Sequence, residues 1–127
     1  MTDMYKQGAI SWAELQTTDV EGAKKFYTEL LGWTTEDFPS EEMPYTIVKA
    51  GGEGVGGIMA IPCEATGAPP HWGIYITTND VDAATRKAHE LGATIMVPPM
   101  DIKGVGRFSL IRDPQGAMFS MITYLRK

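Results

Sequence analysis

Thr17-Thr18-Asp19-Val20 and Thr77-Thr78-Asn79-Asp80-Val81 open two stretches of this chain in the same way. Apolar residues follow each opening at steps of three, four and three, the spacing of the buried stripe of an amphipathic helix. We expect each helix to end at a glycine, Gly32 or Gly92, because glycine readily adopts the left-handed conformation that closes a helix. The two openings lie about half of the 127-residue chain apart. The sequence therefore predicts one small αβ module present twice.

Short segments around both helices alternate apolar and polar residues, as strands do. Each half then reads β-α-β-β-β, with its helix on one face of a mixed sheet and Trp72, Ile74 and Ile76 among the residues that face the helix. The predicted fold class is α+β, in which the helix-free faces of two paired sheets form a cupped cavity. We expect a single domain over 1–127, with module 1 at about 8–62, a linker at 63–70 and module 2 at about 71–125. The predicted strands are 8–16, 33–37, 45–50 and 55–61, then 71–77, 94–97, 107–112 and 118–124.

Composition and charge narrow the possible partners. A formal charge of −5 argues against a nucleic-acid or anionic-membrane surface, and no apolar run is long enough to span a bilayer. The single cysteine, Cys63, excludes an intrachain disulfide and suits a reducing compartment. The N-terminal residues lack the apolar region of a signal peptide. The expectation is a soluble cytoplasmic protein with neither nucleic acid nor membrane as a partner.

Strand alternation indicates which side chains face the predicted cup. Their aromatic and apolar character favours a pocket for a planar or hydrophobic small molecule, although packing as core or as a dimer contact would use the same side chains. Glu14 is the acidic residue of this set and could act as a general base or hold a polar group of the ligand; otherwise it is a hydrogen-bonded carboxylate without chemistry. His71 lies either at the pocket rim or on the plain surface. The predicted ligand-binding residues are Trp12, Glu14, Met59, His71, Tyr75, Met118, Ser120, Ile122 and Tyr124.

Three local patterns have a functional and a structural interpretation. Gly52–Gly57 matches G-x-G-x-x-G, but the strand-like residues after it exclude the helix that a dinucleotide site requires, so it predicts a hairpin turn. Asp101–Arg107 is either a mobile flap or a simple β-connection. Thr18 and Glu21 have the spacing of a helix capping box.

Several stretches, in their order and spacing, resemble the vicinal oxygen chelate superfamily, which comprises glyoxalases, bleomycin-resistance proteins and extradiol dioxygenases. The similarity is greatest to its 27-kDa-antigen-like, glyoxalase-related branch. The resemblance covers essentially the whole chain and implies the duplicated fold, a small organic ligand and a homodimer. The matching stretches are Trp12–Leu15, Phe26–Trp33, Pro69–Tyr75, Asp80–Ala84, Pro98–Phe108 and Asp113–Phe119.

Metal-dependent members of this superfamily carry four ligands, usually His, Gln or Glu. The matching positions here hold Trp12, Gly73, Ser120 and either Gly57 or Met59, which cannot hold a divalent cation. The resemblance therefore implies the cup without a metal or other cofactor. The leading hypothesis is a protein that binds a small organic ligand without a metal. The first alternative is a glyoxalase-like lyase or isomerase, which would use metal ligands at positions other than these or acid–base catalysis by Glu14 with Tyr75 or Ser120. The second alternative is a drug-sequestering or regulatory binding protein.

Overall fold

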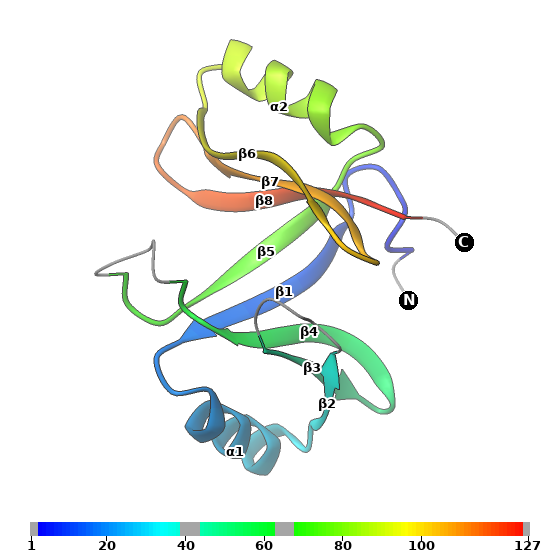
Figure 1. Cartoon of the computed structure of the whole chain (residues 1–127), viewed down its shortest axis with the longest axis vertical. Coiled ribbons are helices and arrows are strands. Elements are labelled where there is room, and N and C mark those ends of the chain that lie inside the picture. The colour runs from blue at the N-terminus through cyan, green and yellow to red at the C-terminus, as the bar shows by residue number, and fades with distance from the viewer. Residues whose placement is uncertain (1–2, 39–43, 63–67, 126–127) are drawn as a thin grey trace. The chain divides into compact units, whose positions relative to one another are not determined.

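The computed structural model describes residues 3–38, 44–62 and 68–125 (Figure 1). Its elements follow the order β-α-β-β-β and then β-α-β-β-β, within an α+β fold of eight strands and two helices. The predicted α+β class is confirmed. The elements are β1 (Ile10–Thr17), α1 (Val20–Leu31), β2 (Thr34–Phe38), β3 (Tyr45–Ala50), β4 (Glu53–Ala60), β5 (His71–Thr77), α2 (Val81–Glu90), β6 (Thr94–Ile102), β7 (Gly106–Arg112) and β8 (Met118–Tyr124).

The chain divides into two compact units. The first-half unit comprises Trp12–Gly73, and the second-half unit combines the residues up to Ser11 with the chain from Ile74 onward. The start of β1 thus belongs with the second half, where the Gly8 amide donates to the Thr77 carbonyl oxygen at 2.8 Å. The predicted linker falls partly, and Cys63 wholly, outside the described residues. The cup expected between the two modules stays a prediction.

Each unit has a mixed sheet. In the first-half unit the strand order is β2-β3-β4-β1, with β1 parallel to β4 and the other pairs antiparallel. In the second-half unit the order is β5-β8-β7-β6, with β5 parallel to β8 and the other pairs antiparallel. None of the described helices is long and apolar enough to span a membrane.

The ends of the helices follow the chemistry of their terminal residues. The Asp19 side chain accepts a hydrogen bond from the Gly22 amide at 2.9 Å and caps α1. The N-cap is therefore Asp19 and not Thr18, so the capping box predicted from Thr18 and Glu21 is wrong. Gly32 closes α1 in the left-handed conformation (φ 73°), as predicted. Helix α2 begins behind Asp80 in the same manner, and Gly92 follows its end with φ 99°.

The core of the first-half unit lies between α1 and the sheet. Leu15, Val48 and Ile58 are almost fully buried there, and α1 covers them from one side. Trp72 was predicted to meet the helix of its own half, but it contacts α1 instead. Its ring lies 5.5 Å from that of Tyr27, to whose hydroxyl the Trp72 indole donates at 3.3 Å. The start of β5 therefore completes the aromatic cover of the first-half unit.

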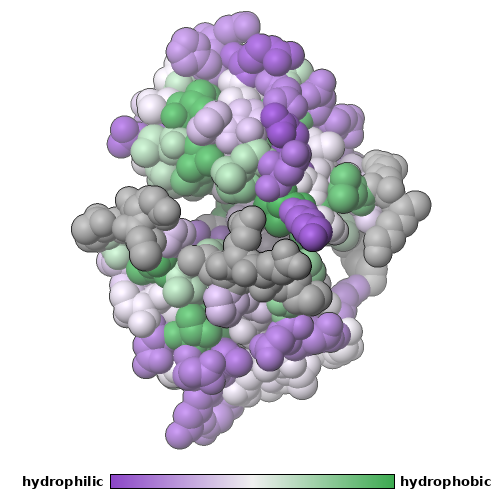
Figure 2. All heavy atoms as spheres, viewed as in Figure 1, coloured by the Kyte–Doolittle hydropathy of each residue, from purple (hydrophilic) through white to green (hydrophobic). Residues whose placement is uncertain are grey.

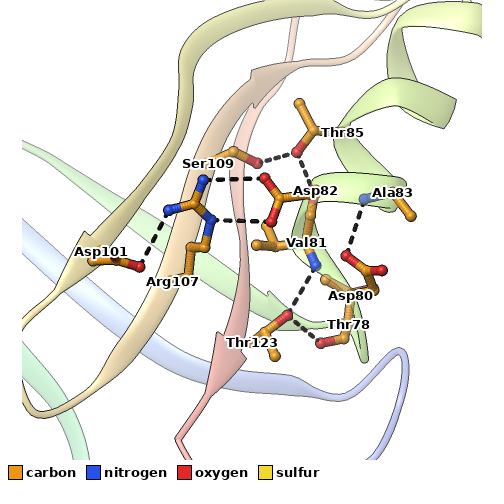
Figure 3. Close-up of polar contacts among 10 residues, drawn as sticks. All are labelled: Thr78, Asp80, Val81, Asp82, Ala83, Thr85, Asp101, Arg107, Ser109 and Thr123. Atoms are coloured by element: carbon orange, nitrogen blue, oxygen red, sulfur yellow. Dashed lines mark hydrogen bonds and ion pairs between the residues drawn. The ribbon is translucent and has the colours of Figure 1, made fainter.

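The core of the second-half unit combines apolar and polar contacts beneath α2. Val81 and Ile111 are 2% and 0% exposed. Thr85 donates to the Val81 carbonyl oxygen at 2.6 Å and shares a 2.9 Å hydrogen bond with Ser109, which is buried on β7 (Figure 3). Sequence periodicity missed Thr85, because the predicted stripe contained only apolar residues. Its hydroxyl is accommodated because every buried polar atom in this pair has a partner.

Strands β6 and β7 form a hairpin, so Asp101–Arg107 is a β-connection and no flap. Strand β6 is longer than the predicted 94–97 segment and continues through Pro98 and Pro99. A register shift between Val97 and Met100 accommodates these prolines. Strand β6 is also the end strand of its unit's sheet, where a missing amide donor is tolerated. The Val105 amide closes the turn on the Ile102 carbonyl oxygen at 2.9 Å.

An ion pair ties α2 to this hairpin. The Arg107 guanidinium donates from Nε and Nη2 to the two carboxylate oxygens of Asp82, at 3.0 and 3.1 Å, and from Nη1 to Asp101 at 3.2 Å (Figure 3). These hydrogen bonds hold the pKa of Asp82 below its ordinary value of 3.8. All three side chains keep substantial contact with water, which screens the pair.

We expect this pair to make stability depend on pH in the acid range. A carboxyl with a lowered folded-state pKa stabilises the fold above its unfolded pKa, and that contribution is lost as pH falls through the folded pKa. The urea midpoint should therefore decline as the pH is lowered past 3.8, the ordinary pKa of this carboxyl. In Asp82→Asn this part of the decline should be missing. Equal acid profiles for wild type and variant would contradict the assignment.

Candidate ligand-binding faces

Each unit has one sheet face that its helix does not cover. In β1, Leu15 points into the core beneath α1, so Trp12, Glu14 and Gln16 lie on the opposite face by strand alternation. The register pairs Glu14 with Gly57 and Gln16 with Met59, which places Met59 on this face as well. We call this surface of the first-half unit the open face.

Glu14 is a buried carboxylate on the open face. Its residue is only 7% exposed, and Gln16 Nε2 donates to Glu14 Oε2 at 3.2 Å. Desolvating a carboxylate is costly unless hydrogen bonds or a charge compensate for the lost water. The Gln16 amide supplies one such bond to the acidic residue that the sequence singled out.

Tyr45 on β3 also belongs to the open face and was missed from sequence. It lies two residues before Ile47, which pairs with Gly57, and its ring contacts Phe38 edge-on at 6.3 Å. The indole Nε1 of Trp12 donates to Tyr45 Oη at 2.8 Å. No signal in the sequence singles out Tyr45, because its ring lies over Gly57, whose partner in the strand register is Ile47.

His71 is exposed at the start of β5. Its Nδ1 lies 2.7 Å from the Pro69 carbonyl oxygen, and because a carbonyl only accepts, this nitrogen carries the hydrogen. The contact supports the surface interpretation of His71 over the rim of a pocket.

The second-half unit has its own uncovered face. Ser109 on β7 and Thr123 on β8 contact α2. The residues that alternate with them along each strand therefore point away from α2. Ser120 and Ile122 on this face are 7% and 3% exposed, whereas Met118 at the strand start is 46% exposed. Tyr75 pairs with Ser120 in register, and its ring lies 6.3 Å from Phe108.

Tyr124 on this face is held by the N-terminal segment. Its hydroxyl and that of Ser11 share a 2.8 Å hydrogen bond, and the ring of Tyr5 meets it edge-on at 6.1 Å. Burial raises the pKa of Tyr124 above its ordinary value, although the bond to Ser11 acts in the other direction. The phenol is therefore neutral at physiological pH.

The predicted residues are thus divided between the two units. Trp12, Glu14, Met59 and His71 belong to the first, and the remaining five belong to the second. Their convergence on one cavity stays a prediction. A groove of about 450 Å³ within the second-half unit lies elsewhere, between α2 and β6. Figure 2 shows hydrophilic residues gathered over α2. The groove is lined by Asp82, Thr85, Arg86, His89, Glu90, Ile95 and Pro99.

The four positions that match the metal ligands of the superfamily do not suit a metal ion. The Trp12 indole nitrogen carries a hydrogen that it donates to Tyr45, so it has no lone pair for a cation. Gly57 and Gly73 have no side chain, and Ser120 or Met59 alone is a weak ligand. Over residues 3–38, 44–62 and 68–125, no three His, Cys, Asp or Glu side chains are grouped as a metal would need.

Comparison with known proteins places the chain in a family. Residues 9–121 match the Glyoxalase/Bleomycin resistance protein/Dioxygenase superfamily. Over 116 residues the chain is 44% identical to "Putative glyoxylase CFP32" of Mycobacterium tuberculosis (strain CDC 1551 / Oshkosh), covering 89% of this chain and 44% of the relative. It is 30% identical over 130 residues to "Anthracycline biosynthesis protein DauV" of Streptomyces sp. (strain C5), covering 92% and 47%. The chain thus spans about half the length of these relatives.

Solved structures share the fold at low sequence identity. Methylmalonyl-CoA epimerase from Mycobacterium tuberculosis superposes with a TM-score of 0.69 at 14% identity, covering 91% of this chain and 87% of the epimerase. The hypothetical protein BH1468 from Bacillus halodurans C-125 gives 0.70 at 14% identity, covering 96% and 98%. At this identity the likeness concerns the fold alone. The sequence match over residues 9–121 establishes that the chain belongs to the Glyoxalase/Bleomycin resistance protein/Dioxygenase superfamily.

Proposed function

We propose that this protein binds a small organic molecule on the open face and does so without a metal ion. The observation that carries the proposal is the buried carboxylate of Glu14, only 7% exposed, next to the paired side chains of Trp12 and Tyr45. A planar apolar ligand would gain contact area from the indole and the phenol ring. A hydroxyl or amine on the same ligand would donate to Glu14.

Keeping a carboxylate on a mostly apolar face is unfavourable for folding alone. The Gln16 amide donates to this carboxylate. A ligand group that donates to Glu14 would add a charge-assisted hydrogen bond. Charge-assisted hydrogen bonds of this kind contribute about 1.5–3 kcal/mol.

The named relatives support a small-molecule ligand in general terms. One is named as a glyoxylase and another for anthracycline biosynthesis, and both names refer to low-molecular-weight compounds. The further expectations of a homodimer and of a cytoplasmic location follow from the resemblance and the composition. The exposed apolar side chains of α1, Phe26, Leu30 and Leu31, would suit a partner subunit.

The proposal is tested with 3-hydroxyflavone, a planar aromatic probe that carries a hydroxyl group. Addition of the probe should quench the tryptophan emission of the wild-type protein, and the quenching should saturate as the probe concentration rises. Glu14→Gln should raise the dissociation constant about 10-fold or more, because the charged hydrogen-bond acceptor is lost. Glu21→Gln is the matched control, since Glu21 lies on α1 with its side chain 84% exposed. Absence of saturable binding by the wild type, with no organic mass retained in native mass spectrometry, would refute the proposal.

A second candidate function is a glyoxalase-like lyase or isomerase. The position of Glu14 beside Trp12 and Tyr45 favours it, because a carboxylate within reach of a bound ligand can act as a general base. The assay is turnover of the hemithioacetal of methylglyoxal and glutathione, with added zinc or nickel and with chelator. Turnover that Glu14→Gln abolishes would replace the binding function by this one. Turnover that chelator abolishes but Glu14→Gln does not would show that the metal ligands are residues other than the four positions assigned from the sequence.

A further inference from the structure

We infer that the groove between α2 and β6 binds a zwitterionic ligand with an apolar body, of the class of the free apolar α-amino acids. Arg86 holds the carboxylate of this ligand, and Glu90 holds its ammonium group. The residues that line the groove belong to the second-half unit, whereas the open face belongs to the first-half unit. The inference therefore stands independently of the function proposed for the open face.

The groove has the size and part of the lining of a small-molecule site. Its volume of about 450 Å³ lies within the range of roughly 300–1,000 Å³ that is usual for such sites. Ile95 and Pro99 of β6 line it and are half-buried. Thr85 lines it from α2, but its hydroxyl hydrogen is already donated to the Val81 carbonyl oxygen. These three side chains therefore offer a ligand apolar contact.

Arg86 on α2 forms no hydrogen bond or ion pair with another side chain in the described part of the chain. Its natural helical partner is Asp82, four residues earlier, but Arg107 already donates to both carboxylate oxygens of Asp82. The pKa of Asp82 is lowered chiefly by this hydrogen bonding to Arg107, and Arg86 contributes only through its charge. The exposed Arg86 guanidinium thus keeps its planar fork of N–H donors, which matches a carboxylate.

Glu90 is the last residue of α2, and its exposed carboxylate is also unpaired among the described residues. It follows Arg86 by four residues, yet the two side chains form no ion pair. This agrees with the weaker pairing found when the cation precedes the anion along a helix. A carboxylate at the C-terminal end of a helix also lies at the negative end of the helix dipole. A cationic group bound beside Glu90 compensates for both effects.

The two free charges of the groove have opposite signs and are separated by roughly 6 Å of rise along α2. An α-amino acid carries its carboxylate and its ammonium group on the same carbon, so the flexible side chains of Arg86 and Glu90 can reach both. Its apolar side chain then lies on Ile95 and Pro99. A simple anion or a simple cation would leave one of the two protein charges without a partner, and this favours the zwitterion.

The test titrates three probes into isotope-labelled protein and follows the backbone amide chemical shifts. The probes are L-leucine, L-leucinamide, which lacks the carboxylate, and N-acetyl-L-leucine, which lacks the ammonium group. Leucine should cause saturable shifts in α2 and β6. Arg86→Gln should raise the dissociation constants of leucine and N-acetyl-leucine about 3–10-fold and change that of leucinamide less than about 2-fold. Glu90→Gln should weaken leucine and leucinamide by a similar factor and spare N-acetyl-leucine.

Lys87→Gln is the matched control, because it removes a positive charge from a neighbouring exposed position of α2 that does not line the groove. It should change all three dissociation constants less than about 2-fold. Equal losses for all three probes in Arg86→Gln or Glu90→Gln would indicate a structural role of these side chains and overturn the inference. Absence of saturable shifts in α2 and β6 with leucine would overturn it as well. Neither result would affect the function proposed for the open face, which is tested separately with 3-hydroxyflavone.

Discussion

Replacing Ile58 by alanine is expected to lower the free energy of unfolding by about 2–5 kcal/mol, since the removed methyl and ethyl groups leave a cavity that the core fills only partly. Ile58 is 1% exposed and packs with Leu15 and Val48 beneath α1. Loss of these contacts removes the surface on which α1 rests. Denaturant titration followed by circular dichroism measures the change.

Ile10→Ala is the matched control for this substitution. Ile10 has the same side chain at the start of β1 but is 62% exposed. Its replacement should change the free energy of unfolding by no more than about 0.5 kcal/mol. A loss below about 1 kcal/mol at Ile58 would show that this position is no part of a tightly packed core.

Gly106→Ala is expected to destabilise the second-half unit by about 1–3 kcal/mol or more, the range found for overpacked interiors. An added Cβ would overlap the Thr123 carbonyl oxygen and lie 2.9 Å from the Tyr124 Cα atom. Both atoms belong to the backbone of β8, so no side-chain rotation relieves the overlap. Strands β7 and β8 must move apart. Thr123, which accepts from the Val81 amide at 3.0 Å, would move away from the start of α2.

Hydrogen exchange distinguishes this local effect from general destabilisation. Amides of β7, β8 and the first turn of α2 should exchange faster in Gly106→Ala than in wild type. Gly73→Ala is the control, because a Cβ there meets nothing within 4 Å and its backbone is outside the left-handed region. Unchanged exchange in Gly106→Ala would mean that the strands can separate without loss of pairing.

The glycines show how sequence and structure divide the information. Helix-ending glycines such as Gly32 are recognisable from sequence, because a left-handed residue after an amphipathic stripe is a local requirement. Gly57 and Gly106 look no different in the sequence from other strand glycines. Their role depends on which group crosses them from a neighbouring strand, the Tyr45 phenol in one case and the β8 backbone in the other.

The candidate site was predictable only where strand alternation decides it. The parity of β1 places Trp12 and Glu14 away from Leu15, and this follows from the period of two in any strand. Tyr45 was not predictable, because its ring reaches over β4 to Trp12 on a strand 33 residues earlier in the chain. Trp72 was assigned to the wrong helix for the same reason, since alternation gives a face and not the partner that covers it.

The sequence by itself determined the element order, the glycines at the C-terminal ends of the helices and the superfamily, because these depend on local periodicity, the conformational freedom of glycine and motif order. The strand pairing that joins β1 to β4 in parallel, the contact of Trp72 with α1 and the proximity of Tyr45 to Gly57 were decided by the tertiary structure alone. Each of these brings together residues far apart in the chain. Such contacts are selected by the packing of the whole unit, for which no short stretch of sequence carries a signal.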